Sequence, residues 1–303
     1  MPQTKTQRRQ GFLKPEEIIK IKDLSLVARG IVEGLVAGHH KSPYKGFSLE
    51  FAEHRKYTHG DEIKHLDWKV YGRTEKYFVK LYEAETNMRV YLLLDTSESM
   101  NFSGGFGLTK LTYGTYLCAA LAYLINKQQD QVGLVTYNNK ITRILPPRHH
   151  PDHMARMINN LSSIQAEGKT HTSAVLQDLA ERIQKRSLLI LISDLLDDPE
   201  TVLRSVGQFR FRKHEIMVFH VLDNAEWIFP YKQMSTFVDM ETHQKITVDP
   251  IALRMDYLRA IEKFKIHYQA GFSKMNTDYI PVNTLVPFEY VLSSYLAKRK
   301  KIR

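Results

Sequence analysis

Three short polar segments contain the residue types that bind a hard metal cation. They are DTSES at 95–99, GKT at 168–170, and Asp194. Carboxylate and hydroxyl oxygens suit Mg²⁺, and a set with only two carboxylates lets the ion keep several waters. Neutral hydroxyl ligands also leave the ion most of its Lewis acidity, so a Glu or Asp from outside the chain would bind it strongly. The segments therefore predict a metal site that can capture an acidic group.

The spacing within the first segment has a physical reason. In an Asp-x-Ser-x-Ser turn, alternate side chains can point at one ion, and here these are Asp95, Ser97 and Ser99. The same residue types commonly cap helices and turns, so the motif alone also fits a purely structural role. The elements beside the three segments favour the metal site.

Those elements would bring the segments together. Apolar runs of strand length occupy 90–95, 187–194 and 215–222, and such continuous runs are typical of strands covered on both faces. In open parallel sheets, ligands bind beyond the carboxyl ends of the strands. Asp95 and Asp194 each end one of these runs, so we expect them at the same edge of a sheet.

From residue 89 to 303, apolar strands alternate with helical patterns. This alternation predicts a Rossmann-like α/β domain with a mostly parallel sheet and helices on both faces. Further strands are expected at 131–137 and 141–145, a hairpin at 236–248, and helices at 110–127, 152–162, 173–185, from 199 onward, at 251–274 and at 286–300. Ahead of this domain, we expect a basic tail at 1–13, then a helix from Pro15 to Ala37 and a small annex of strands and turns, together spanning 14–88.

The composition limits the classes of function. The formal net charge is +10, with much of the excess at the two ends of the chain. A basic surface can attract nucleic acid, an anionic membrane or an acidic protein, but no basic segment is interleaved with aromatics as in nucleic-acid-binding motifs. Cys118 is the single cysteine, which excludes an internal disulfide and a cysteine-based zinc site. No apolar run could span a membrane and no secretory signal is recognisable, so we expect a cytoplasmic protein.

The three segments resemble the metal-ion-dependent adhesion site of von Willebrand factor A domains. The resemblance implies that the hydroxyls of Ser97, Ser99 and Thr170 bind the ion and that Asp95 and Asp194 act directly or through water. It implies Mg²⁺ as the cofactor, with Mn²⁺ or Ca²⁺ as alternatives. Thr172 competes with Thr170 for the third hydroxyl, but Thr170 fits the family's Gly-x-Thr pattern before a helix.

A second signature precedes the strand at 90–95. Its residues are Arg55, Tyr57, Gly60, Asp61, Asp67, Trp68, Arg73 and Thr74. They follow the order Arg-x-Tyr-x-x-Gly-Asp, then Asp-Trp, then Arg-Thr, and this pattern resembles that of the bacterial domain-of-unknown-function-58 family. A structural role would be a tight turn at Gly60-Asp61, an Arg–Asp pair and a tryptophan that docks the annex. The alternative role is a partner-binding surface.

These features together predict a non-enzymatic interaction protein that uses Mg²⁺ to capture an acidic residue of a partner. The family resemblance implies a MoxR-type AAA+ ATPase or its client as that partner, with this protein as adaptor or co-chaperone. A basic nucleic-acid-associated protein and, less favoured, a metal-dependent phosphohydrolase are the alternatives. A P-loop at 168–170 is disfavoured because the preceding residues have a helical pattern rather than a strand.

Overall fold

The computed structural model describes residues 15, 21, 23–39, 54–58, 66–80, 88–105 and 107–302. The chain divides into two compact units, one of residues 42–87 and one of residues 1–41 together with 88–303. The predicted basic tail at 1–13 lies outside the described residues.

A six-stranded sheet forms the centre of the larger unit. Its strands are β3 (Arg89–Asp95), β4 (Gln131–Tyr137), β5 (Ile141–Arg148), β6 (Leu188–Ser193), β7 (Glu215–Leu222) and β10 (Asp278–Asn283). The spatial order is β10-β7-β6-β3-β4-β5, and every neighbouring pair is parallel except β4 and β5. The predicted Rossmann-like α/β fold with a mostly parallel sheet is therefore confirmed.

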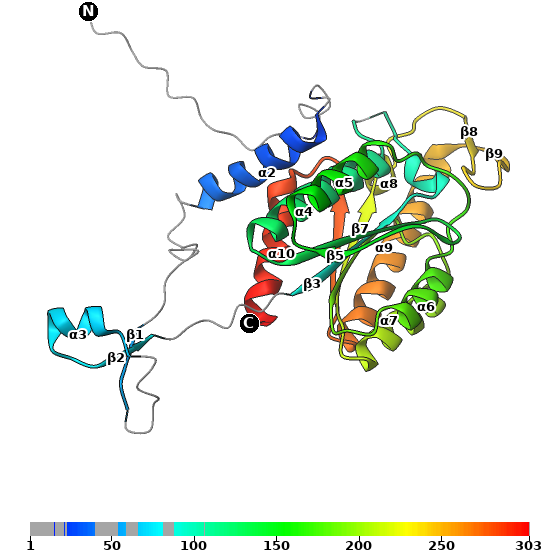
Figure 1. Ribbon diagram of the computed structural model, residues 1–303. Coiled ribbons are helices and arrows are strands. Elements are labelled where there is room, and N and C mark those ends of the chain that lie inside the picture. Colours follow the sequence, from blue (N-terminus) through cyan, green and yellow to red (C-terminus); the bar gives the residue numbers. More distant parts are fainter. Residues whose placement is uncertain are drawn as a thin grey trace, which may run out of the picture. The chain divides into compact units, whose positions relative to one another are not determined.

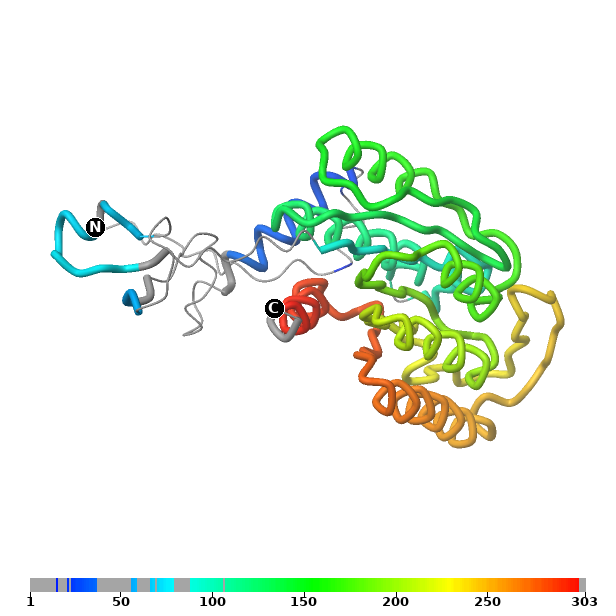
Figure 2. The backbone as a smooth tube through the Cα atoms, turned by 60° about the horizontal axis from the view of Figure 1, so that its bottom comes forward, coloured from blue at the N-terminus to red at the C-terminus, as the bar shows by residue number. Residues whose placement is uncertain are grey.

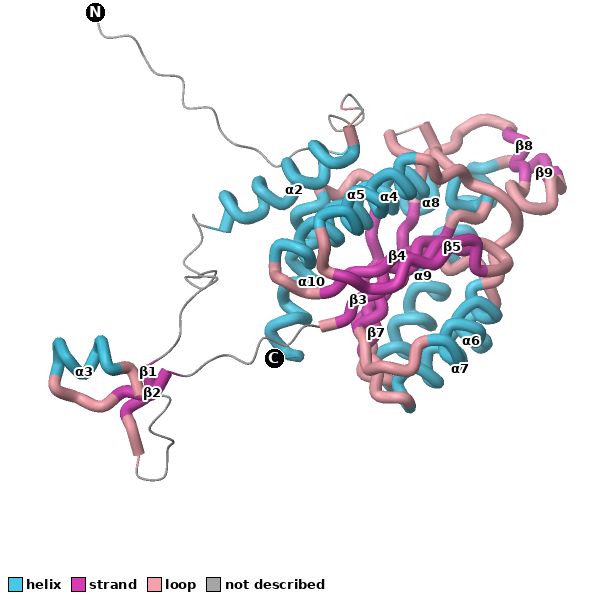
Figure 3. The backbone as a smooth tube through the Cα atoms, viewed as in Figure 1, coloured by secondary structure: helices cyan, strands magenta, loops and turns pink. Residues whose placement is uncertain are grey.

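Helices cover both faces of this sheet (Figures 1 and 3). They are α4 (Lys110–Lys127), α5 (Pro151–Ser162), α6 (Thr172–Arg182), α7 (Pro199–Phe211), α8 (Asn224–Ile228), α9 (Pro250–Lys274) and α10 (Phe288–Ile302). Successive side chains of β3 point to opposite faces of the sheet, and each face has its own hydrophobic core. Leu92 and Leu94 pack in the core with α4 and α10, whereas Leu93 packs in the core with α6, α7 and α9. Figure 2 shows α9, in orange, running beside α7.

The helix predicted from Pro15 to Ala37 is interrupted: Pro15 is helical, but helix α2 spans Leu24–His39. Ile21 and Asp23 are not helical. The Asp23 carboxylate accepts hydrogen bonds from the backbone N–H groups of Ser25 and Leu26 at 2.8 and 3.2 Å. An aspartate in that position satisfies donors that the first helical turn leaves free, and this fixes the start of the helix.

The same helix belongs to the larger unit. It packs against α4 and α10 and buries Val27, Ile31 and Leu35 in their common core. The boundary predicted from the sequence grouped this helix with the annex at 14–88, and the structure differs there. The apolar stripe of the helix is buried against helices that follow it by more than 70 residues, and periodicity alone does not reveal that partner.

The smaller unit contains β1 (His54–Lys56), α3 (Trp68–Thr74) and β2 (Phe78–Lys80). The two strands pair antiparallel, as expected for an annex of strands and turns. Helix α3 was not predicted, because seven residues are too few to reveal a helical period. It begins after Asp67, whose carboxylate accepts a hydrogen bond from the backbone N–H of Val70 at 3.3 Å.

The sequence prediction also missed β10 and α8. Pro281 lies within β10, and a proline normally argues against a strand. Here it is tolerated because β10 is an edge strand, paired only with β7. Among the described residues, no helix combines the length and the apolar character needed to cross a bilayer.

We expect α2 to contribute to the stability of the larger unit. Ile31 is fully buried, so Ile31→Ala should lower the free energy of unfolding by about 3 kcal/mol. Leu26 lies on the same helix but is 61% exposed, and Leu26→Ala should change stability by less than about 0.5 kcal/mol. Denaturant unfolding of both variants tests this, and equal effects would show that the helix does not pack as described.

Candidate functional site

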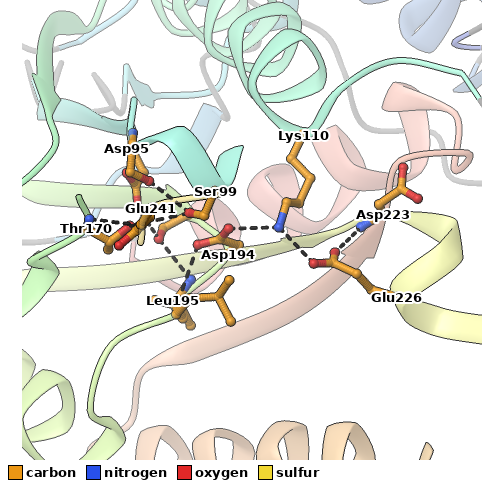
Figure 4. A network of polar contacts seen from close by, with 12 residues as sticks. Asp95, Ser99, Lys110, Thr170, Asp194, Leu195, Asp223, Glu226 and Glu241 are labelled. Atoms are coloured by element: carbon orange, nitrogen blue, oxygen red, sulfur yellow. Dashed lines mark hydrogen bonds and ion pairs between the residues drawn. The ribbon is translucent and has the colours of Figure 1, made fainter. Parts of the chain in front are cut away.

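The two predicted aspartates lie at the same edge of the sheet. Asp95 ends β3, Asp194 directly follows β6, and these two strands are neighbours. Both carboxylates are fully buried. Figure 4 shows them with the polar side chains that surround them. The carboxyl ends of adjacent parallel strands therefore meet here, as the sequence predicts.

A row of three hydroxyls lies beside Asp95. The backbone N–H of Ser97 donates to Asp95 Oδ1 at 3.0 Å, which folds the segment after β3 into a tight turn. Ser97 Oγ lies 3.0 Å from Ser99 Oγ, and Ser99 Oγ lies 3.4 Å from Thr170 Oγ1. Ser99 belongs to the short 3-10 helix η2 (Glu98–Asn101), so the alternate residues of the motif do converge.

Two backbone hydrogen bonds hold the loop of Thr170 against the loop after β3. The N–H of Glu98 donates to the carbonyl of Gly168 at 2.9 Å, and the N–H of Glu167 donates to the carbonyl of Thr96 at 2.8 Å. Gly168 has a φ of +76°, which favours glycine, and a side chain there would also press on Asn138. The glycine of the Gly-x-Thr pattern is therefore explained by backbone conformation.

Thr170, and not its competitor Thr172, lies beside the serine hydroxyls. Thr170 reaches Ser99, whereas the hydroxyl of Thr172 is fully buried and lies 3.4 Å from the hydroxyl of Tyr137. The chain before Gly168 forms helix α5, so residues 168–170 do not have the strand-loop-helix arrangement of a P-loop.

Burial makes Asp95 an unusual carboxylate. Burial first, and then the negative charge of Asp194, raise the pKa of Asp95 to about 7. Hydrogen bonds from Ser193 and Ser97 oppose this rise, with Ser193 Oγ donating to Asp95 Oδ2 at 2.6 Å. Two neighbouring buried carboxylates repel each other, so the pair is stabilised by a proton or by a cation.

Lys110, which the sequence reading did not single out, lies on the other side of Asp194. Its ammonium group donates to Asp194 Oδ2 at 2.8 Å and to Glu226 Oε1 at 2.9 Å, and the side chain is only 1% exposed. Burial alone would lower the pKa of Lys110, but the charges of Asp194 and Glu226 raise it above its ordinary value. Lys110 is therefore a fixed positive charge within the site (Figure 4).

Glu226 and Glu241 are two further acidic residues that the sequence reading missed. Glu226 belongs to the capping box that begins α8, where its Oε2 accepts from the N–H of Asp223 at 2.7 Å. Glu241 lies in the turn between β8 (Ser235–Val238) and β9 (Lys245–Val248). Its Oε1 accepts from both the backbone N–H and the hydroxyl of Thr170, at 3.0 and 2.8 Å.

The donor set fits a hard divalent cation. It offers only oxygen atoms, from two buried carboxylates and three converging hydroxyls, and such a set suits Mg²⁺. Within the described part of the chain, no three His, Cys, Asp or Glu side chains are grouped as a metal site. A cation here would therefore depend on the hydroxyls of Ser97, Ser99 and Thr170 in addition to the two aspartates.

Some of the signature residues of the smaller unit have identifiable structural roles. Asp67 caps α3, and the backbone N–H of Tyr57 donates to the carbonyl of Tyr77 at 3.0 Å. Trp68 contacts Tyr71 edge to face and is 58% exposed, and Arg73 is also exposed. Gly60 and Asp61 lie outside the described residues, as does the side chain of Arg55, so the structure does not describe the predicted turn and Arg–Asp pair.

We expect Lys110 to be essential for stability. Lys110→Met would leave Asp194 and Glu226 buried without their counter-charge. The free energy of unfolding, measured in EDTA, should therefore fall by about 3–5 kcal/mol. Lys127 lies at the exposed end of the same helix, and Lys127→Met should have little effect. Thermal and denaturant unfolding compare the two variants, and equal stability would show that the buried ion pairs do not form.

Several solved structures are similar to this chain. BatB from Bacteroides thetaiotaomicron is 13% identical with a TM-score of 0.45, over 71% of this chain and 99% of that chain. An aerotolerance-related membrane protein from Bacteroides fragilis is 15% identical with a TM-score of 0.45, over 70% and 99% of the two chains. The SpRpn10 VWA domain is 10% identical with a TM-score of 0.40, over 69% and 95%.

Sequence comparisons give the family. Uncharacterised proteins of Mycobacterium bovis and Mycobacterium tuberculosis are 26% identical to this chain over 251 residues, which are 81% of this chain and 78% of each relative. The family described as "Protein of unknown function DUF58" matches residues 53–266, more than half of the chain and a span that includes all of the site residues described above. The protein therefore belongs to the DUF58 family.

Proposed function

We propose that this protein is a metal-dependent protein-interaction module and not an enzyme. In this proposal, Mg²⁺ is held by Ser97, Ser99 and Thr170 together with Asp95 and Asp194, and it captures an acidic residue of a partner. The observation that carries the proposal is the row of three hydroxyls beside two buried aspartates at the carboxyl edge of the sheet.

The charge balance of the site supports this role. Three neutral hydroxyls do not offset the charge of a bound cation, so the cation would attract an additional carboxylate. Lys110 already neutralises part of the charge on Asp194 through the contact at 2.8 Å. Asp95 and Asp194 would therefore supply too little negative charge to balance a divalent ion fully, and a further carboxylate, such as an acidic side chain of a partner, would supply the rest.

The proposed roles of the two aspartates leave hydrolysis without a general base. A metal-dependent hydrolase needs a group that can take a proton from the attacking water. The pKa of Asp95 is raised to about 7, but in this proposal Asp95 and Asp194 both hold the cation. A carboxylate oxygen that binds the cation does not serve as that base.

The nature of the partner comes from the family resemblance. By that resemblance alone, we propose a MoxR-type AAA+ ATPase, or its client, as the acidic partner, and the cytoplasm as the compartment. In that setting this protein would act as an adaptor or co-chaperone.

Mg²⁺ binding by the purified protein tests the site. Ser99→Ala removes the central hydroxyl of the row, and we expect it to weaken Mg²⁺ binding about tenfold, or roughly 1.4 kcal/mol. Asp95→Asn should weaken binding further. Asp256→Asn removes a charge from an exposed site on α9 and is the matched control. Isothermal titration measures all three, and unchanged affinity in both site variants would contradict the proposed metal site.

A pull-down from a bacterial lysate tests the interaction. Wild-type protein and Asp95→Ala are compared in Mg²⁺ and in EDTA, with the bound proteins identified by mass spectrometry. We expect an AAA+ ATPase or another partner to be retained only by the wild type in Mg²⁺. If the same proteins bind in all four conditions, the metal site is not the binding element.

A further inference from the structure

Glu241 reaches the candidate metal site from a distant part of the chain. Its Oε1 lies 2.8 Å from the hydroxyl oxygen of Thr170, and that same oxygen lies 3.4 Å from Ser99 Oγ. Glu241 Oε1 also accepts from the backbone N–H of Thr170 at 3.0 Å. A carboxylate of the protein itself thus lies beside the row of hydroxyls (Figure 4).

The turn that carries Glu241 is organised by Asp239. The Asp239 carboxylate accepts from the backbone N–H groups of Glu241 and Thr242 at 3.0 and 2.6 Å. The backbone N–H of Asp239 donates to the carbonyl of Gln244 at 2.9 Å, and His243 adopts a φ of +58°. These bonds fix the backbone at Glu241, so its side chain is directed by the turn.

Aromatic side chains hold the β8–β9 hairpin in place. Phe237 of β8 stacks on Phe229 with ring centroids 5.7 Å apart, and Phe229 stacks on Tyr257 of α9 at 4.5 Å. Tyr231 meets Phe237 edge to face at 5.1 Å. Phe229 is only 4% exposed. The hairpin is therefore anchored to α9 by a packed cluster, and the position of Glu241 does not depend on the Thr170 contact alone.

The contacts at this point favour a cation beside Glu241. Its carboxylate lies against Thr170, at one end of the row of hydroxyls, while the ammonium of Lys110 is already bonded to Asp194 and Glu226. Carboxylate and hydroxyl oxygens together are ligands that a hard divalent cation prefers. A hydroxyl that binds a cation through its oxygen keeps its proton, so Thr170 could bind an ion and still donate to Glu241.

We propose that Glu241 is an intramolecular carboxylate ligand of this metal site. It occupies the position that the acidic residue of a partner takes in the proposed function, on which this inference rests. A partner must then displace the carboxylate of Glu241 before its own carboxylate can bind. Glu241 accordingly lowers the affinity of the site for any external carboxylate.

Water-proton relaxation of bound Mn²⁺ tests this proposal, because it reports the number of exchanging waters on the ion. Glu241→Ala should raise the relaxivity per bound Mn²⁺ by the contribution of at least one water and should weaken Mn²⁺ binding several-fold. Acetate should then lower the relaxivity of Glu241→Ala while leaving the wild type unchanged. Glu181→Ala, which removes an exposed carboxylate of α6, should behave as the wild type.

Two results separate this inference from the proposed function. If Asp95→Ala abolishes Mn²⁺ binding but Glu241→Ala leaves the relaxivity and the acetate response unchanged, Glu241 is not a ligand and the metal site stands. If Mn²⁺ does not bind the wild type, or binds Asp95→Ala equally well, the proposed function fails and this inference fails with it.

Discussion

The burial of two neighbouring carboxylates is the constraint on which the rest of the site depends. Asp95 and Asp194 are held at the ends of adjacent parallel strands, where water cannot screen their mutual repulsion. Hydrogen bonds from Ser193 and Ser97 stabilise Asp95, and the buried ammonium of Lys110 stabilises Asp194. These contacts offset only part of the negative charge. A bound cation would offset the remainder, and this connects the packing of the sheet to the proposed function.

The fold was predictable where the signal is local. Strands β3, β6 and β7 have continuous apolar runs, and α4 has a helical period, within short stretches of sequence. The structure forms these elements at the predicted positions. The partner of α2 and the strand β10 were not predictable in the same way. The first depends on packing against residues far along the chain, and the second contains Pro281, which is acceptable only because the strand lies at an edge.

The candidate site also contains residues that local sequence patterns reveal and residues that only the fold brings together. Asp95, Ser97 and Ser99 form a compact motif. The order of the elements was enough to bring Thr170 to Ser99 and to place Asp194 at the end of the strand next to that of Asp95. Lys110, Glu226 and Glu241 were missed because single charged residues usually lie on the solvated surface. Lys110 is 84 residues from Asp194 and 116 from Glu226, and Glu241 is 71 residues from Thr170. Only the folded sheet and the β8–β9 hairpin make these residues neighbours.

A cation that balances the charge at this edge of the sheet should be visible by anomalous diffraction from a crystal grown in Mn²⁺. We expect one strong anomalous peak within roughly 2.0–2.5 Å of the hydroxyl oxygens of Ser97, Ser99 and Thr170. No peak at that position with Mn²⁺ in large excess, or a peak only at another site, would contradict the proposed metal site.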